Sequence, residues 1–218
     1  MLEDCAWLGI GWTPPMIVQS ERLALYREAF ERLLASGYAY PCTCSRRELT
    51  QMVQAPHEDT DDEPVYSGKC RAGNGATPHT IQPGMNYRFR VPDGETIGFR
   101  DANMGEQAFA AGKDFGDFLI WRKDALPSYQ LACVVDDAAM HITEVVRGAD
   151  LLKSTARQIL LQRALGLPGV SYFHAQLMCD EHGVRLAKRH DALAIRALRQ
   201  RGLARDEVLQ MIADHTQA

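Results

Sequence analysis

The sequence predicts an α/β fold in which helices cover a parallel sheet, with an irregular insertion and a helical C-terminal segment. Apolar runs alternate with helix-like segments between residues 113 and 178, as in sheets with crossover helices. Prolines and glycines instead interrupt residues 42–112. The 218 residues are 46% hydrophobic and 24% charged, and no apolar stretch approaches the roughly 18 residues of a spanning helix. Disordered and membrane classes are therefore excluded.

An amphipathic helix is the first regular element that the sequence predicts. It opens at Ser20, carries apolar residues at helical spacing and is closed by Gly37. A short strand-like run, Tyr87–Val91, then lies within the irregular residues 42–112.

Apolar runs and one helix alternate in the next part of the chain. The helix runs from about Asp150 to Leu165 and is closed by Gly166. The apolar runs, which we expect to be strands, are Phe118–Trp121, Tyr129–Val135, Ile142–Val146 and Tyr172–Met178.

The C-terminal segment is strongly basic although the whole chain has a net charge of -4. From Arg185 to Arg205 it holds seven lysines and arginines against one acid, Asp191. Asp191 is expected to cap a short helix that ends at Gly202, and a second helix starts near Asp206. A basic helical segment can bind a phosphate backbone, but a solvated helix face explains the same charges.

Three of the six cysteines, Cys42, Cys44 and Cys70, are close enough in sequence to share a task. Because no secretory signal is present, we expect a cytoplasmic protein with reduced thiols. Thiolates can converge on a tetrahedral zinc ion, which needs a fourth ligand. Candidates for that ligand are Tyr66, His57 and His79, of which only Tyr66 adjoins Cys70. Spacing alone leaves a zinc site and half-buried free thiols equally open.

Two further groups of residues could carry chemistry. The basic run Arg185-Leu-Ala-Lys188-Arg189 could neutralise charge on phosphates, although a solvated loop explains it more simply. Arg147 follows a strand and could hold a carboxylate bidentately, near Tyr129, or it could pair with Asp150 for structure.

Together these fragments resemble the glutamate branch of class I aminoacyl-tRNA synthetases over nearly the whole chain. The Cys-x-Cys and Tyr-x-x-x-Cys arrangement, the Tyr-Gln-Leu-Ala run and the early end of the chain are similar to the glutamyl-Q tRNA(Asp) synthetase family. Those paralogues of glutamyl-tRNA synthetase lack the anticodon-binding domain and place glutamate on the queuosine of tRNA(Asp). The motifs that carry the resemblance are Leu2-Glu-Asp-Cys-Ala-Trp7-Leu-Gly9, Gln19-Ser-Glu-Arg22, Tyr40-Pro-Cys-Thr-Cys-Ser-Arg46, Tyr129-Gln-Leu-Ala-Cys-Val-Val-Asp-Asp137, Ile142-Thr-Glu-Val-Val-Arg-Gly-Ala-Asp-Leu-Leu152 and Arg185-Leu-Ala-Lys188.

The resemblance implies a Rossmann-like catalytic domain, N-terminally incomplete, that uses ATP, L-glutamate and tRNA, with tRNA(Asp) as the expected tRNA. It implies Mg²⁺ with the ATP, a structural zinc ion, a monomer and no membrane association. The expected parts are a remnant of the first Rossmann half (1–41), a zinc-bearing insertion (42–112), the second Rossmann half (113–178), and a KMSKS-like loop with C-terminal helices (179–218).

Functional residues follow from the same resemblance, position by position. The family's glutamate-binding tyrosine and arginine fall on Tyr129 and Arg147, and the ATP-binding lysine of the KMSKS loop falls on Lys188, where it would stabilise the reacting phosphate. Ala187 stands where the family has serine. The family's zinc ligands fall on Cys42, Cys44, Tyr66 and Cys70.

The family's HIGH-type motif, first sheet strand and acidic glutamate-binding residue would precede Met1. We interpret this as a misassigned start, a truncated gene or a degenerate relative, and we expect glutamate-dependent ATP–pyrophosphate exchange near background from this chain alone. Two competing hypotheses are a noncatalytic, zinc-containing RNA-binding relative and a fragment of an ordinary glutamyl-tRNA synthetase.

Overall fold

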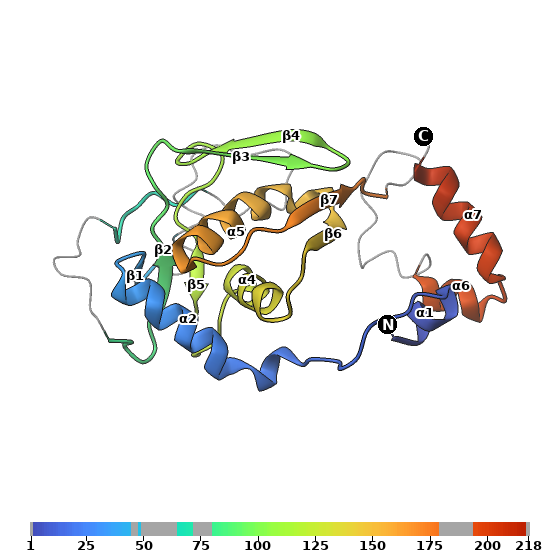
Figure 1. Cartoon of the computed structure of the whole chain (residues 1–218), viewed down its shortest axis with the longest axis horizontal. Helices are drawn as coiled ribbons and strands as arrows, with labels where there is room; N and C mark the ends of the chain where they lie inside the picture. Colours follow the sequence, from blue (N-terminus) through green and yellow to red (C-terminus); the bar gives the residue numbers. More distant parts are fainter. Residues whose placement is uncertain (1, 45–47, 49–64, 72–79, 179–193, 217–218) are drawn as a thin grey trace. The chain divides into compact units, whose positions relative to one another are not determined.

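The computed structural model describes residues 2–44, 48, 65–71, 80–178 and 194–216 (Figure 1). The chain divides into two compact units. The larger unit is Val18–His174, and the smaller combines Met1–Ile17 with Ala175–Ala218. The functional boundaries expected after residues 41, 112 and 178 remain a prediction.

The larger unit contains an antiparallel sheet with strand order β1-β2-β5. Tyr87 and Phe89 of β2 are buried in the main core, which fits the strand expected at Tyr87–Val91. Arg88, between them, points to the other face of the sheet and is also buried. The strands are β1 (Ala39–Cys42), β2 (Asn86–Phe89) and β5 (Leu119–Trp121).

A second sheet, with order β4-β3-β7-β6, corrects the expectation of a parallel sheet. β3 and β7 pair in parallel at Asp101 and Tyr172, but β3 and β4 are antiparallel. The tight turn between β3 and β4, with Gly105 at a φ of 72°, is too short for the crossover that a parallel pair requires. The strands are β3 (Thr96–Asp101), β4 (Gly105–Ala110), β6 (Glu144–Gly148) and β7 (Ser171–Ala175).

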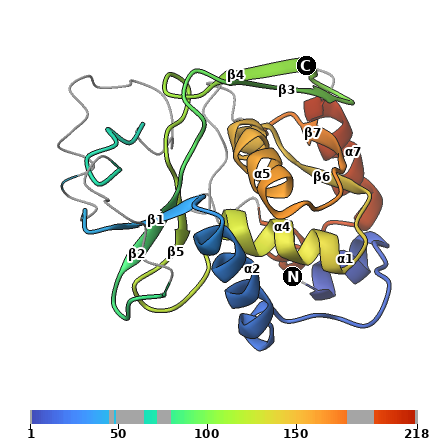
Figure 2. The same ribbon diagram turned by 60° about the vertical axis from the view of Figure 1, so that its left-hand side comes forward.

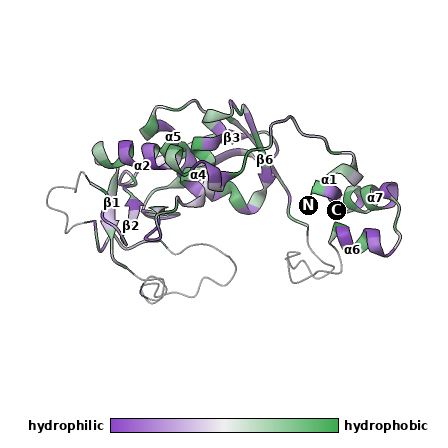
Figure 3. Ribbon diagram, turned by 90° about the horizontal axis from the view of Figure 1, so that it is seen from below, coloured by the Kyte–Doolittle hydropathy of each residue, from purple (hydrophilic) through white to green (hydrophobic). Residues whose placement is uncertain are grey.

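Three helices pack together in the larger unit. α4 contacts both α2 and α5, as Figures 1 and 2 show. Phe30 of α2 stacks on Trp121 of β5 with 4.8 Å between ring centroids, which joins the helices to the first sheet. In Figure 3 these helices carry both hydrophilic and hydrophobic residues. The helices are α2 (Leu23–Ala35), α4 (Tyr129–Ala139) and α5 (Leu152–Leu165), with 3₁₀ turns at Gln19–Glu21 (η1) and Ala149–Leu151 (η2).

Helix ends agree in part with the sequence. α2 begins at Leu23 rather than Ser20, because residues 19–21 form the 3₁₀ turn η1. α5 ends at Leu165, and Gly166 adopts the left-handed conformation with a φ of 64°, so the predicted C-terminal glycine is confirmed.

The strand expected at Tyr129–Val135 is wrong, because these residues form the start of α4. The Ser128 side chain accepts a hydrogen bond from the Leu131 amide and caps this helix. Leu131, Val134 and Val135 are buried at the i, i+3, i+4 spacing of one helix face. A short apolar run suits both structures, and here the cap and the packing decide in favour of the helix.

The smaller unit is helical within its described residues. The Arg199 guanidinium donates to Asp4 at 2.6 Å, and α1 also contacts α7. The expected cap Asp191 lies outside the described residues, and α6 begins at Ile195, with Ala194 at its N-cap position. None of the described helices is long and apolar enough to cross a membrane. The helices are α1 (Leu2–Leu8), α6 (Ile195–Gln200) and α7 (Arg205–Thr216).

Candidate functional site

The sequence-predicted sulfur and phenol groups lie together. β1 ends at Cys42, the next turn carries Cys44, and residues 65–71 bring Tyr66 and Cys70 to the same place. The three sulfur atoms lie within 4.8 Å of one another. Tyr66 Oη is 3.6 Å from both Cys42 Sγ and Cys44 Sγ, and Cys44 Sγ is 3.5 Å from Cys70 Sγ. We call Cys42, Cys44, Tyr66 and Cys70 the thiol cluster.

A buried arginine contacts the thiol cluster. Arg88 Nε donates to Cys42 Sγ at 3.4 Å, and its guanidinium carbon lies 4.2 Å from the centre of the Tyr66 ring. Its NH1 donates to the Asp117 carbonyl oxygen at 2.8 Å. A buried cation therefore lies against one sulfur atom of the thiol cluster and against the face of its phenol ring.

Protonation differs among the cysteines of the thiol cluster. Burial, together with contact with the Cys70 thiol, raises the pKa of Cys44 to about 11 against an opposing hydrogen bond from Tyr66. Burial also acts to raise the pKa of Cys70, but hydrogen bonds from Tyr66, Thr43 and Cys44 outweigh it and lower the pKa to about 6. Burial raises the pKa of Tyr66 above its ordinary range.

The donor set of the thiol cluster fits a tetrahedral metal ion. Sulfur ligands at about 2.3 Å from zinc lie roughly 3.7 Å apart in a regular tetrahedron, close to the contacts among these groups. Cys42, Cys44 and Tyr66 are buried, with 2%, 6% and 8% of their surface exposed, so a bound ion would be shielded from water on that side. His57 and His79, the other candidate ligands, lie outside the described residues.

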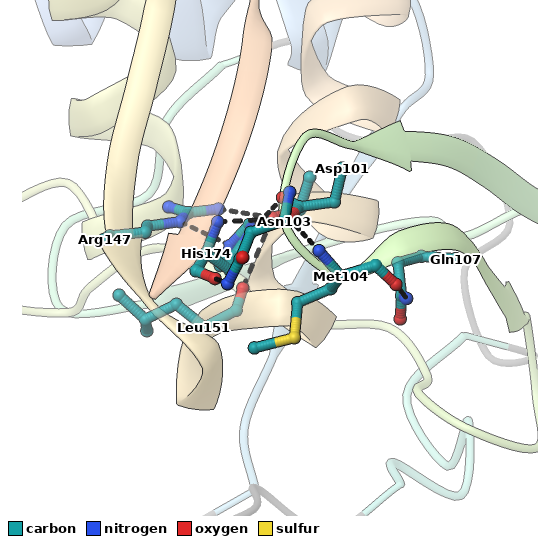
Figure 4. A network of polar contacts seen from close by, with 8 residues as sticks. Asp101, Asn103, Met104, Gln107, Arg147, Leu151 and His174 are labelled. Atoms are coloured by element: carbon teal, nitrogen blue, oxygen red, sulfur yellow. Dashed lines mark hydrogen bonds and ion pairs between the residues drawn. The ribbon is translucent and has the colours of Figure 1, made fainter. Parts of the chain in front are cut away.

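Arg147, at the carboxyl end of β6, belongs to a second polar network, which Figure 4 shows. Its Nε donates to His174 Nε2 at 3.1 Å, and its NH2 donates to Thr155 Oγ1 at 2.6 Å. The other ring nitrogen of His174, Nδ1, lies 2.6 Å from Asp101 Oδ2. Residues from β6, β7, β3 and α5 therefore meet in one hydrogen-bonded network, in which His174 of β7 and Thr155 of α5 contact the guanidinium directly.

Asp101 anchors this second network at the end of β3. Its Oδ1 accepts hydrogen bonds from the Asn103, Met104 and His174 amides. Burial alone would raise the pKa of Asp101, but the His174 side chain and these amides outweigh burial and lower the pKa to about 2. The carboxylate is therefore ionised at neutral pH and can only accept hydrogen bonds.

Tyr129 lies at the start of α4, with 51% of its surface exposed. Burial of its phenol and the neighbouring Cys133 raise the pKa of Tyr129, while the Arg147 guanidinium opposes the rise. Burial also raises the pKa of Asp137, and the Arg147 guanidinium opposes this rise. The Arg147 guanidinium therefore lies near enough to Tyr129 to influence its phenol, and a joint role of the two residues in binding glutamate stays a prediction.

Sequence reasoning missed several residues of these two groups. Asp101, Thr155, His174 and Arg88 are all buried polar residues. A histidine inside the apolar run Tyr172–Met178 and an arginine inside Tyr87–Val91 were available as signals. Lys188, the expected ATP-binding residue, lies outside the described residues.

The chain matches the family model described as "tRNA synthetases class I (E and Q), catalytic domain" over residues 1–215. It is 42% identical to a glutamyl-Q tRNA(Asp) synthetase from Symbiobacterium thermophilum, over 97% of this chain and 68% of that protein. It is 44% identical to the Geobacter sulfurreducens protein of the same name, over 98% of this chain and 65% of that one. The chain therefore spans about two thirds of the length of these relatives.

Glutamate–tRNA ligases are similar as well. The Aquifex aeolicus enzyme is 40% identical over 93% of this chain and 43% of its own length. The crystal structure of a glutamate tRNA ligase from Elizabethkingia meningosepticum, in complex with its amino acid, superposes with a TM-score of 0.68 at 25% identity. That superposition covers 92% of this chain and 42% of the ligase.

Proposed function

The chain belongs to the family of class I glutamyl- and glutaminyl-tRNA synthetase catalytic domains, and on this premise we propose that it activates glutamate with ATP and transfers it to the queuosine of tRNA(Asp). The premise is supported by the match over residues 1–215. The acceptor is supported by the similarity to glutamyl-Q tRNA(Asp) synthetases at 42% and 44% identity.

The geometry of Arg147 is the observation that carries the proposal. Two neutral acceptors, His174 Nε2 and Thr155 Oγ1, hold one side of the guanidinium. A guanidinium can present further N–H groups to a carboxylate in a bidentate contact, and Tyr129 beside it supplies a phenol that can donate or accept. Arg147 and Tyr129 would thus select glutamate by binding its α-carboxylate or its γ-carboxylate.

The activation step requires positioning and charge rather than a protein nucleophile. An oxygen of the glutamate α-carboxylate attacks the α-phosphate of ATP and pyrophosphate leaves, which gives glutamyl-adenylate. The nucleic-acid hydroxyl then attacks the acyl carbon and AMP leaves. Lys188 would neutralise charge on the reacting phosphate, and Mg²⁺ bound with ATP would supply further positive charge there.

The thiol cluster would hold a structural zinc ion. Three thiolates and a phenolate would fill all four tetrahedral positions and leave none for a substrate. Cys42 belongs to β1 and Tyr66 to the segment 65–71, so an ion held by both would join two parts of the larger unit. The role is therefore in folding, not in the reaction.

A second acceptor, tRNA(Glu), is supported by the 40% identity to the Aquifex aeolicus glutamate–tRNA ligase. The two acceptors are separated by assaying the full gene product with radioactive glutamate and three RNAs: tRNA(Asp) with queuosine, tRNA(Asp) with guanine in its place, and tRNA(Glu). Labelling of queuosine-containing tRNA(Asp) alone is expected.

Labelling of tRNA(Glu) alone would move the function to ordinary glutamyl-tRNA synthesis. Glutamate-dependent ATP–pyrophosphate exchange tests the first step by itself, with aspartate and glutamine as control substrates. Absence of exchange together with absence of labelling would overturn the proposed activity.

A further inference from the structure

Asp101 and His174 form a buried pair that the proposed reaction leaves unexplained. Their side chains have 0% exposure, and His174 Nδ1 lies 2.6 Å from Asp101 Oδ2. The pair exists because β3 and β7 run in parallel, with Asp101 opposite Tyr172, so that His174 lies two residues further along β7. Polar groups buried so completely cost stability unless they are well paired, and apolar residues could fill the same volume.

The direction of the hydrogen bonds follows from the chemistry of Asp101. Because this carboxylate is ionised and only accepts, His174 must carry its proton on Nδ1 and donate it to Oδ2. His174 Nε2 is then a lone-pair acceptor, and Arg147 Nε donates to it at 3.1 Å. Asn103 Nδ2 further fixes this part of β7 by donating to the His174 carbonyl oxygen at 2.8 Å.

The groups that touch Arg147 in this network are uncharged. The imidazole and the Thr155 hydroxyl orient the guanidinium, whereas the negative charge of Asp101 is held one ring away. A carboxylate in direct contact with Arg147 would neutralise it and compete with a carboxylate ligand. An imidazole between Asp101 and Arg147 orients the guanidinium without neutralising its charge.

We propose that Asp101, His174 and Thr155 are positioning residues that aim the Arg147 guanidinium at the substrate carboxylate while leaving its charge available to that substrate. This inference rests on the proposed role of Arg147 in glutamate binding. Asp101, His174 and Thr155 would thus affect glutamate binding through Arg147 without contacting the substrate themselves.

Two replacements of Thr155 test whether the charge of Arg147 must stay available to the substrate. The side chains introduced by Thr155→Asn and Thr155→Asp have nearly the same shape and differ by one negative charge beside Arg147. In ATP–pyrophosphate exchange by the full gene product, the KM for glutamate should rise about tenfold more in Thr155→Asp than in Thr155→Asn, with an unchanged KM for ATP. Equal KM values for glutamate in the two variants would overturn the inference.

His174→Asn tests whether His174 links Asp101 to Arg147. The asparagine amide can still donate to Asp101 but offers no acceptor at the position of Nε2, so the KM for glutamate should rise about tenfold while the KM for ATP stays constant. An equal rise in both KM values, or in neither, would overturn the inference. Arg147→Ala is measured in parallel. If this variant leaves the KM for glutamate unchanged, the proposed function fails. If the KM for glutamate rises in Arg147→Ala but not in the His174 and Thr155 variants, only the positioning role is overturned.

A measurement on the unmodified protein tests the inference without requiring that any variant folds. The ¹⁵N chemical shifts of the His174 ring at pH 8 distinguish the two neutral tautomers. A proton on Nδ1 is expected. A proton on Nε2 would leave Arg147 Nε without its acceptor and would overturn the inference.

Discussion

The Arg88 guanidinium lies 4.2 Å from the centre of the Tyr66 ring, and through this contact a buried cation adjoins the thiol cluster. Arg88 also donates to Cys42, so it contacts two proposed zinc ligands. Three thiolates and a phenolate around Zn²⁺ would carry a net charge of about -2, which is costly in a buried site. Arg88 offsets part of this charge.

Metal content gives the first prediction. Protein purified without chelators should contain about one zinc ion per chain, because the thiol cluster supplies a tetrahedral donor set. Cys44→Ser should lower the zinc content and the melting temperature, since a structural ligand contributes folding free energy. Elemental analysis and thermal unfolding measure both. Cys133→Ser is the matched control, since Cys133 lies on α4, and full zinc content in Cys44→Ser would exclude Cys44 as a ligand.

Arg88→Met should weaken zinc affinity by roughly 10- to 100-fold, the usual cost of losing a residue that hydrogen-bonds a metal ligand. Competition with a chromophoric chelator measures the affinity. Arg100→Met, which removes an arginine with 84% of its side chain exposed, should leave the affinity unchanged. Equal affinities in Arg88→Met and the unmodified protein would show that Arg88 does not stabilise the ligand charge.

Stability should depend on pH through Asp101. Its pKa is lowered to about 2 in the folded protein, so its hydrogen bonds stabilise the fold at pH values above the ordinary pKa near 4 and lose this effect as the pH falls toward 2. The contribution is on the order of 2 kcal/mol. The difference in unfolding free energy between the unmodified protein and Asp101→Asn should therefore shrink from pH 5 to pH 2, as measured by urea unfolding. A difference that stays constant over this range would contradict the lowered pKa.

Arg147→Ala should impair glutamate use much more than ATP use. Loss of a charged contact to a carboxylate costs roughly 1.5 to 3 kcal/mol, or about ten- to a hundredfold in apparent affinity. The Michaelis constants for glutamate and ATP in pyrophosphate exchange measure the two effects, with Arg100→Ala as the control. If both Michaelis constants are unchanged in Arg147→Ala, the role of Arg147 is purely structural.

The family motifs, the α/β class and the grouping of Cys42, Cys44 and Cys70 could be predicted from the sequence, whereas Tyr66 was one of three candidate fourth ligands until the family resemblance favoured it. Cys42 and Cys44 are neighbours in the chain, and Tyr66 precedes Cys70 by four residues, so short spacing was enough to group them in two pairs. The glycine that follows α5 could also be predicted, because the left-handed conformation that commonly ends a helix favours glycine whatever packs around it.

The helix at Tyr129–Ala139, the mixed sheet and the Asp101–His174–Arg147 network follow from the packing of the folded chain and could not be predicted from local sequence. The short apolar run in α4 suits a strand or a helix until its burial is known. Asp101 and His174 are 73 residues apart and meet because β3 and β7 pair in register, which is a long-range contact that no local pattern encodes. Local spacing determines turns and helix ends, whereas the pairing of distant strands determines which buried polar groups meet.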